Sequence, residues 1–509
     1  MLFNSFIFLC AFLPICWGVF ALLRGRRLFQ ISVCWLILCS LVFYGYWNPP
    51  YLILILGSIA VNYAFGHAQN LLHDQGKQSR PLMAGAVLFN LGLLGYYKYA
   101  GFITENINAL SASALLVPDI ILPLAISFFT FQQIAYQVDA YRGETKEHGF
   151  LDYVLFVTFF PQLVAGPIVH HKEMMPQFRA QRTLGINPDH LALGLVLFSC
   201  GLFKKVVLAD NLARYATPVF DAANGDVPLT LFESWGGVLA YSFQIYFDFS
   251  GYSDMALGLA ALFGIMLPLN FLSPYRAGNI IDFWRRWHIT LSRFLRDYLY
   301  IPLGGNRKGK LRRYNNLLMT MLIGGIWHGA GWTFVIWGGL HGVYLIINHA
   351  WHRVLKGARI THPIYKLAAW ALTFTAVSFA WVFFRAESAD AAFNICRALI
   401  GQNGAVLDYR LESILPFMAD LIRFEGTGIG AFPSVYGVLW LGAAAGIAWL
   451  CPNIYSMLAV KTDQDSLLVN NLAALPKGRR TLLLAFMALL LVVALGQIGA
   501  PSEFLYFDF

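Results

Sequence analysis

Two histidines that could do acid–base chemistry, His288 and His328, lie 40 positions apart in the sequence. His328 is in the middle of the apolar sequence IGGIWHGAGWTFVIWGGLHG at 323–342, away from charged residues along the chain. Imidazole is the side chain best suited to acid–base work near neutral pH, and an ionisable group at membrane depth is costly. His328 is therefore the first candidate for catalysis or proton handling, with a structural hydrogen bond as the alternative.

The second histidine, His288, lies in the sequence NIIDFWRRWHITLSRFLRDYLY at 279–300. At about 100° per residue, this segment predicts an amphipathic helix with arginines on one arc and Trp284, Trp287 and Leu291 on the other side. The arginines on that arc are Arg285, Arg286, Arg293 and Arg296. His288 falls on the apolar side, so we expect either a hydrogen-bonded core histidine or an ionisable group aimed into a cavity.

A cluster of cations follows directly, since GGNRKGKLRR at 304–313 holds five Lys and Arg in ten residues. One interpretation is an anchor that keeps this loop on the cytoplasmic face of a membrane. The other is a landing site for a phosphate-bearing substrate, with glycines that let the backbone approach closely. The pattern GxxxxGK[ST] is absent, so a nucleotide-binding P-loop is not expected.

Two acidic residues, Asp248 and Asp254, lie in the apolar sequence YSFQIYFDFSGYSDMALGLAALFGI at 241–265 without a Lys or Arg in that stretch. Tyr252 is four residues after Asp248, on the same helical face, where a hydrogen bond would make the acid tolerable. These side chains are either a polar clamp between helices or part of a substrate or proton path.

No arrangement typical of a metal site is visible. The sequence has no HExxH motif, and His341 lies 13 residues after His328, on a different face of a helix. None of the seven cysteines forms a CxxC pair. We expect no metal and no permanently bound cofactor.

The elements that must position these groups are membrane helices. Hydrophobic residues make up 58% of the 509 residues, charged residues 12%, and the mean hydropathy is +0.59. A water-soluble globule would have to expose much apolar surface, and a disordered chain would be more polar, so both are excluded. At ~20 residues per crossing, the length predicts an all-α polytopic membrane protein with on the order of a dozen spans. The net charge of +9 does not indicate nucleic-acid binding, because the cations lie between apolar runs.

The longest apolar runs, 235–267 and 315–349, are each long enough for more than one pass or a re-entrant piece. Another run, at 151–169, is interrupted by Pro161, Gly166 and Pro167. Non-helical backbone at membrane depth has to be buried in protein or line a cavity. We therefore expect a break in the helix at 151–169.

Loop charge predicts the topology. The loops at 276–313, 353–366 and 461–480 hold ten, four and four Lys and Arg, whereas 100–120 holds none. Cytoplasmic loops collect cations, so we expect the first three inside and 100–120 outside. Counting crossings from there places 385–432 and both termini on the outer face.

Three stretches resemble the membrane-bound O-acyltransferase (MBOAT) family, and within it the bacterial alginate O-acetyltransferase (AlgI-like) branch. They read FDFSGYSDMALGL, NFLSPYRAGNIIDFWRRWHITLSRFLRDYLYIPLGGNR and TMLIGGIWHGAGWTFVIWGGLHG. The opening MLFNSFIFL, the region from YRGE to FPQLVAGPI at 141–168 and the aromatic end FLYFDF agree with that branch. The resemblance runs nearly end to end, and the order and spacing of the motifs make it specific.

The resemblance implies a single integral-membrane domain over 1–509 with a catalytic core at about 121–349. The family fold is a ring or funnel of about 11–13 tilted transmembrane and re-entrant helices around a central tunnel. The essential histidine of the family matches His328, and a second family histidine matches His288.

The resemblance also implies acetyl-CoA as the donor substrate, entering from the cytoplasm. Its phosphates are expected to meet cations, and its pantetheine arm to pass the glycine-rich stretch. The expected donor-binding residues are Arg285, Arg286, Arg307, Lys308 and Trp327, and the expected polar residues of the tunnel are Asp248, Tyr252 and Asp254.

The expected function is transfer of an acetyl group across the bacterial inner membrane for O-acetylation of an exopolysaccharide, with alginate as the first choice. A separate periplasmic protein like the SGNH hydrolases is the expected partner, because this chain has no soluble domain. The alternatives are another polymer, such as cellulose, peptidoglycan or teichoic acid, and a transporter or scaffold without chemistry. His328 is expected to act as general base or to carry a transient acetyl group, with His288 orienting it or the donor.

Overall fold

The fold was analysed in a computed structural model of the chain. The structure describes residues 1–509 except 112, 146–148, 182–185, 226–227, 356–359, 414, 420–421, 426–427, 431, 433, 459–460, 463–467, 470–474, 500–504 and 506–509. The aromatic end at 504–509 therefore lies outside the described residues, apart from Leu505.

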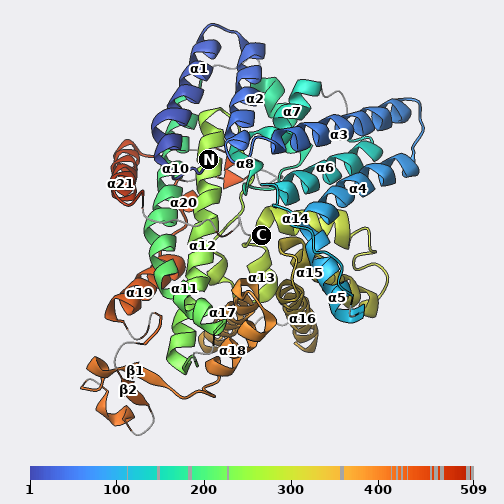
Figure 1. Cartoon of the computed structure of the whole chain (residues 1–509). Coiled ribbons are helices and arrows are strands. Elements are labelled where there is room, and N and C mark those ends of the chain that lie inside the picture. The colour runs from blue at the N-terminus through green and yellow to red at the C-terminus, as the bar shows by residue number, and fades with distance from the viewer. Residues whose placement is uncertain are drawn as a thin grey trace. The chain divides into compact units, whose positions relative to one another are not determined.

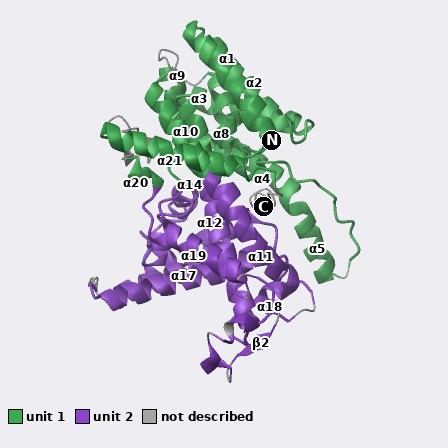
Figure 2. Ribbon diagram, turned by 90° about the vertical axis from the view of Figure 1, so that its left-hand side faces the viewer, with its two compact units in different colours: residues 1–202, 252–270, 454–500 green, residues 203–251, 271–453, 501–509 purple. Residues whose placement is uncertain are grey.

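The chain forms two compact units that alternate along the sequence (Figure 2). Unit 1 consists of Met1–Leu202, Tyr252–Asn270 and Ile454–Ala500, and unit 2 of Phe203–Gly251, Phe271–Asn453 and Pro501–Phe509. Both catalytic histidine candidates belong to unit 2. The single domain over 1–509 stays a prediction.

Unit 1 is built from helices, with one short antiparallel pair of strands. Its elements are η1 (Phe8–Phe12), α1 (Leu13–Gly25), α2 (Phe29–Gly45), α3 (Tyr51–Asp74), α4 (Arg80–Leu94), η2 (Gly95–Tyr99), α5 (Ala100–Ser111), α6 (Ile126–Tyr141), α7 (Phe150–Thr158), α8 (Phe160–Leu163), α9 (His171–Gln181), α10 (Pro188–Phe203, whose last residue belongs to unit 2), α20 (Ile454–Met457), β3 (Lys461–Thr462), β4 (Leu468–Val469) and α21 (Lys477–Leu495).

Unit 2 is also helical, with one parallel pair of three-residue strands. Its elements are η3 (Lys204–Ala209), α11 (Asp210–Ala223), η4 (Pro274–Arg276), α13 (Ile280–Trp284), α14 (Ile289–Leu295), η5 (Arg296–Tyr300), α15 (Lys310–His328), α16 (Trp332–Val354), α17 (Pro363–Arg385), α18 (Ala389–Leu399), β1 (Val406–Asp408), η6 (Tyr409–Leu411), η7 (Pro416–Met418), β2 (Arg423–Glu425) and α19 (Val435–Trp449). The long helix α12 (Leu231–Leu262) contributes to both units. The all-α prediction is confirmed.

Several helices have the length and apolar composition of membrane spans. Within the described ranges these are Phe8–Gly25, Tyr51–Asp74, Pro188–Ala223, Pro363–Arg385 and Lys477–Leu495, and α2 and α19 are shorter apolar helices. Their exposed surface is rich in Leu, Ile, Val and aromatic side chains, which suits a hydrocarbon environment. The remaining helices fall short in length or in apolar composition, so the span count expected from the sequence stays a prediction.

Buried amides join α3, α4 and α6, which run side by side in Figure 1. Asn62 and Asn90 exchange two side-chain hydrogen bonds, at 3.1 and 2.6 Å. Gln137 donates to the Asn62 carbonyl at 2.7 Å and accepts from Gln69 at 2.8 Å. Hydrogen bonds of this kind hold helices together where apolar packing alone gives little specificity.

The run at 151–169 is broken as predicted. α7 ends at Thr158, α8 covers Phe160–Leu163, and the non-helical residues that follow are buried. The Phe160 amide donates to the Ser40 hydroxyl at 3.1 Å. A side chain of α2 thus accepts the hydrogen bond of a backbone N–H at the break in the helix. Of the two longest runs, 315–349 divides into α15 and α16, whereas 235–267 forms the single helix α12.

Candidate active site

The glycines around His328 build a tight pair of helices. α15 ends at His328, the backbone is extended at Gly329 and Gly331, and α16 begins at Trp332. Along the pair, a Cβ on Gly338 would collide with the Met321 carbonyl oxygen and would lie 3.2 Å from the Gly325 Cα. The glycines therefore let α15 and α16 touch through their backbones. At these positions the space is filled by the partner helix, so the expected room for a pantetheine arm is not found there.

His328 lies inside an aromatic cluster. Its ring is 4% exposed and meets the rings of Trp327, Trp337 and Phe384 edge to face, at centroid distances of 4.8, 5.1 and 5.2 Å. Trp337 comes from α16 and Phe384 from α17, so three helices fix the imidazole. Apolar surroundings of this kind exclude water and strengthen any hydrogen bond or charge that forms on the ring.

His288 is completely buried, but the helix predicted over 279–300 is not continuous. α13 ends at Trp284, and His288 has a left-handed backbone conformation with φ 43° before α14 begins at Ile289. The Leu272 amide donates to the Arg286 carbonyl oxygen at 3.0 Å, which fastens the turn to a neighbouring segment. The sequence wheel assumed one unbroken helix, and tertiary contacts overrode that local periodicity.

The buried and exposed side chains of this segment nevertheless follow the prediction from the sequence. Trp284, Trp287 and His288 are buried, whereas Arg285 is exposed and Arg286 is partly exposed. The His288 ring meets the Phe249 ring edge to face at 4.8 Å.

One aromatic cluster links the two histidines. Trp287, next to His288, lies 5.0 Å from Trp381, which stacks at 5.8 Å on Trp337, the ring that meets His328. We refer to Trp284, Trp287, Trp337, Trp381, Phe384 and His341 as the aromatic cluster. His328 therefore contacts the aromatic cluster, and His288 follows a member of the cluster in the sequence.

His341 is a member of this cluster that the sequence analysis considered only as a metal ligand. Its ring is completely buried, 4.8 Å from Trp337 and 5.1 Å from Trp284. The sequence signal was its position four residues after Trp337, on the same face of α16. In the described ranges, no three His, Cys, Asp or Glu side chains gather in a way that would hold a metal ion.

The predicted donor-binding cations differ in their availability. Arg307 and Lys308 are exposed in the loop before α15, and Arg285 is exposed in the turn before α14. Arg286 instead pairs with Asp282, with its Nε 2.9 Å from the carboxylate. Trp327 is buried against His328 rather than placed among the cations.

Asp248 has an ionic partner that sequence proximity does not show. Lys205 Nζ lies 2.6 Å from Asp248 Oδ1 and 2.8 Å from Asp210 Oδ1, and the Leu505 amide donates to Asp248 Oδ2 at 3.2 Å. Lys205 and Asp248 are both buried, so the pair satisfies charges that would be costly alone. This geometry is that of a polar clamp.

The two other predicted tunnel residues lie in unit 1. The Tyr252 ring stacks on Phe3 at 4.8 Å, and Asp254 accepts a hydrogen bond from the Tyr455 hydroxyl. Lys205, rather than Tyr252, therefore makes Asp248 tolerable, and the three polar side chains do not form one group within a single unit.

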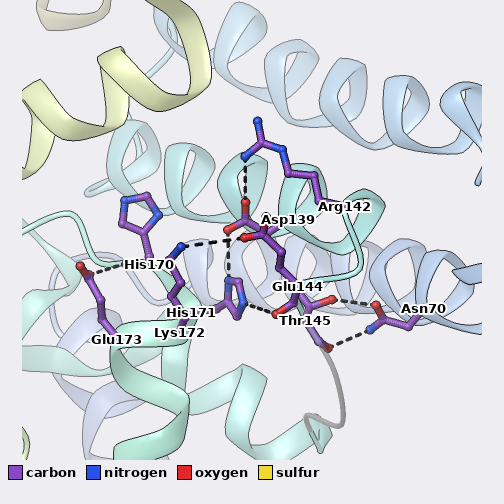
Figure 3. A network of polar contacts seen from close by, with 9 residues as sticks. All are labelled: Asn70, Asp139, Arg142, Glu144, Thr145, His170, His171, Lys172 and Glu173. Atoms are coloured by element: carbon purple, nitrogen blue, oxygen red, sulfur yellow. Dashed lines mark hydrogen bonds and ion pairs between the residues drawn. The ribbon is translucent and has the colours of Figure 1, made fainter. Parts of the chain in front are cut away.

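A further buried histidine, His171, lies in unit 1 (Figure 3). Its Nδ1 is 3.2 Å from Asp139 Oδ2, as in an acid–base dyad, but its Nε2 is 3.0 Å from the Glu144 carbonyl oxygen. Both ring nitrogens are thus engaged within the protein, which suits a structural tether between α6, α9 and the segment after α6. His171 is not a candidate for catalysis.

Comparison with known proteins was made for the whole chain. The pattern of "MBOAT, membrane-bound O-acyltransferase family" matches residues 124–384, which include both histidine candidates. The chain is 47% identical over 444 residues to a peptidoglycan O-acetyltransferase of Helicobacter pylori, covering 82% of this chain and 83% of that protein.

Two further groups of relatives were found. The chain is 41% identical over 404 residues to the "Probable alginate O-acetylase AlgI" of Pseudomonas aeruginosa, covering 78% of this chain and 75% of that protein. It is 30% identical over 241 residues to a teichoic acid D-alanyltransferase of Streptococcus thermophilus, covering 46% of this chain and 58% of that protein.

Proposed function

The chain belongs to the membrane-bound O-acyltransferase family and is a membrane-embedded acyltransferase; from this premise we propose that it takes acetyl groups from cytoplasmic acetyl-CoA for O-acetylation of a cell-envelope glycan. The observation that carries the proposal is the placement of His328. His328 is a buried imidazole at the end of α15 that three aromatic rings meet edge to face, which supports proton transfer in a site with little access to water.

Two chemical routes fit this imidazole. As general base, His328 takes the proton from an acceptor hydroxyl, whose oxygen attacks the thioester carbonyl carbon; the C–S bond breaks, and the CoA thiolate receives the proton. In the other route, a ring nitrogen of His328 attacks the thioester carbonyl carbon, the C–S bond breaks, and CoA leaves as a thiolate that takes up the ring proton. The acceptor oxygen then attacks the acetyl group, the N–C bond breaks, and the hydroxyl proton passes to the imidazole. His288, linked to His328 through the aromatic cluster, is proposed as a positioning residue.

Exposed cations favour a phosphate-bearing donor. CoA carries several phosphate charges, and Arg285, Arg307 and Lys308 are exposed to solvent. Arg286 is a weaker candidate because its guanidinium already forms an ion pair with Asp282. Trp327, beside His328, is placed to contact the acyl end of the donor rather than its phosphates.

The acceptor is proposed from the comparisons. The sequence analysis favoured alginate, whereas identity to the peptidoglycan O-acetyltransferase is higher, 47% against 41%, and extends over more of the chain. Peptidoglycan is therefore the first acceptor to test, and alginate the second.

The location and the partner form part of the same proposal. We propose that the protein lies in the bacterial inner membrane with both termini in the periplasm, because cation-rich loops are typical of the cytoplasmic side. A periplasmic protein resembling the SGNH hydrolases completes transfer to the sugar hydroxyl. The competing hypothesis, a transporter or scaffold without chemistry, gives the two buried histidines no role.

His328→Ala tests the proposal. We expect a folded, inserted protein with at most about one per cent of wild-type activity, because general base catalysis contributes ~10²–10⁴-fold. The measurements are acetyl-CoA consumption by purified protein and the O-acetyl content of isolated peptidoglycan and alginate. The control is His352→Ala, which changes an exposed histidine on α16. Near-normal acetylation by His328→Ala would refute the proposed role, and loss of the folded protein would identify His328 as structural.

A further inference from the structure

His341 and Trp337 present two N–H groups from one face of α16. They are four residues apart, and their side chains are buried, with 0% and 1% exposure. Their rings meet at 63° with centroids 4.8 Å apart. Trp337 also contacts His328, so both side chains belong to the wall of the candidate site.

Trp284 selects the tautomer of His341. The indole Nε1–H of Trp284 donates to His341 Nδ1 at 3.3 Å. An indole N–H is only a donor, so Nδ1 has to be the unprotonated nitrogen. The neutral imidazole therefore carries its hydrogen on Nε2.

That Nε2–H has no acceptor within the part of the chain that the structure describes, and the same holds for the indole N–H of Trp337. Leaving a buried donor unsatisfied costs ~1–3 kcal/mol. Two such donors on one helix face, beside His328, indicate an oxygen that binds during the working cycle.

We propose that His341 Nε2–H is a catalytic hydrogen-bond donor to the carbonyl oxygen of the acyl thioester. The assignment rests on the proposed function. When the nucleophile, a hydroxyl oxygen or the His328 nitrogen, bonds to the carbonyl carbon, the C=O π electrons move onto oxygen, and the N–H stabilises that negative oxygen. When the C=O bond re-forms, the C–S bond breaks and the sulfur leaves with the electron pair.

The surroundings select the chemical class of the ligand. The groups around His341 are aromatic rings, namely Phe283, Trp284, Trp337, Tyr344 and Trp381, so a strongly hydrated phosphate would lose its solvation there without a cation. A thioester carbonyl is neutral and small. His328 and His341 both contact the Trp337 ring, at centroid distances of 5.1 and 4.8 Å, so the proposed position of the carbonyl group is beside that ring.

Two substitutions at His341 separate hydrogen bonding from packing. His341→Gln keeps a donor near the Nε2 position but loses the ring, whereas His341→Phe keeps a ring but loses the donor. We expect His341→Phe to lower kcat for acetyl transfer by ~10²–10³-fold, with His341→Gln within about tenfold of wild type. A packing role predicts the reverse order. His352→Phe, on the exposed side of α16, is the matched control.

An infrared measurement keeps the proposal testable if His341→Phe folds poorly. With [1-¹³C]acetyl-CoA bound to His328→Ala protein, a hydrogen bond to the carbonyl lowers its stretching frequency. The lowered frequency should persist with His328→Ala/His341→Gln and rise with His328→Ala/His341→Phe. If His328→Ala/His341→Gln raises the frequency as much as His328→Ala/His341→Phe does, the donor assignment is wrong.

Different results would refute the proposed function and the His341 assignment. A wild-type protein that does not consume acetyl-CoA overturns the proposed function and the His341 assignment together. A wild-type protein that transfers acetyl groups while His341→Phe keeps the same kcat overturns the His341 assignment alone.

Discussion

At the scale of single residues, the histidines proposed for the chemistry of this protein are buried side chains. His328, His288 and His341 are all buried among aromatic rings, and Lys205 and Asp248 form an ion pair in the same unit. Their types were readable from the sequence, because an ionisable residue within an apolar run is conspicuous.

The interaction partners of these buried residues could not be predicted from the sequence. Lys205 lies 43 positions before Asp248, and Trp284 lies 57 positions before His341. A helical wheel reports only neighbours within one helix, so it offered Tyr252 as the partner of Asp248 and gave none for His341. Contacts between helices far apart in sequence decide these pairings.

The buried ion pair predicts a strong effect of removing its cation. Lys205→Met leaves Asp248 without its ionic partner in the interior, and we expect a loss of ~3–5 kcal/mol in the free energy of unfolding. The measurement is thermal unfolding of the purified protein in detergent, with Lys204→Met, at the less buried neighbouring position, as the control. Lys205→Met/Asp248→Asn should recover part of the loss. If Lys205→Met unfolds like wild type, the pair does not stabilise the fold.

At the scale of elements, the sequence predicts helices better than their interruptions. The break at 151–169 was expected, because proline and glycine mark it. The run 315–349 was long enough for more than one pass, but the position of its division was not predicted. The turn at 285–288 was not expected, because it contains no glycine or proline and is imposed by the contact of Leu272 with Arg286. His288 takes the left-handed conformation there, which local propensity does not favour.

The close contact of α15 and α16 predicts that two adjacent glycines respond differently to the same substitution. A Cβ at Gly338 would collide with the Met321 carbonyl oxygen, whereas a Cβ at Gly339 would meet its nearest neighbour, Leu322 Cδ2, at 3.6 Å. Gly338→Ala should push the helices apart, displace His328 and lower acetyl transfer at least tenfold, given the sensitivity of catalysis to misplacement by about 1 Å.

Gly339→Ala is the matched control for this contact. Alanine at that position makes an ordinary contact and favours the helix by ~0.5–1 kcal/mol over glycine, so activity and melting temperature should stay near wild type or rise slightly. Melting temperature and kcat measured on both variants decide the question. Equal behaviour of the two variants would show that the glycine contact does not position His328.

The loop before α15 predicts an electrostatic effect on donor binding. Arg307, Lys308, Lys310 and Arg312 are exposed, whereas Arg313 contacts His349 at 2.9 Å and is left unchanged. Replacing the four exposed cations by Gln should raise the KM for acetyl-CoA about tenfold, since each exposed ionic contact contributes ~0.2–1 kcal/mol.

Salt distinguishes this role from membrane anchoring. Added salt screens exposed charges, so it should raise the wild-type KM more than that of the Gln variant. Lys477→Gln/Arg479→Gln, at exposed cations in the first turn of α21, is the control and should keep the wild-type KM. A Gln variant that changes only yield or insertion would show that the loop is a topology anchor.

At the scale of the whole molecule, the proposed reaction needs an orientation. Acetyl-CoA is a cytoplasmic metabolite, so the cations proposed to bind it have to face the cytoplasm. The loop at 276–313 holds ten Lys and Arg, and 100–120 holds none. Because cytoplasmic loops of membrane proteins collect cations, the first loop should lie inside. The segment 385–432, which contains α18 and the strands β1 and β2, should then lie on the side of the acceptor.

Single-cysteine labelling tests this orientation. Cys10, Cys34 and Cys451 are exposed free thiols and Cys396 is partly exposed, so all four are first replaced by Ser before a single thiol is introduced. A membrane-impermeant maleimide added to the outer face should label Arg410→Cys, beside β1, in intact cells with a permeabilised outer membrane. Lys308→Cys should react only after the inner membrane is opened, because its loop is predicted to be cytoplasmic. The reverse pattern would invert the topology, place the proposed donor cations on the side without CoA, and remove the electrostatic argument for acetyl-CoA as the donor.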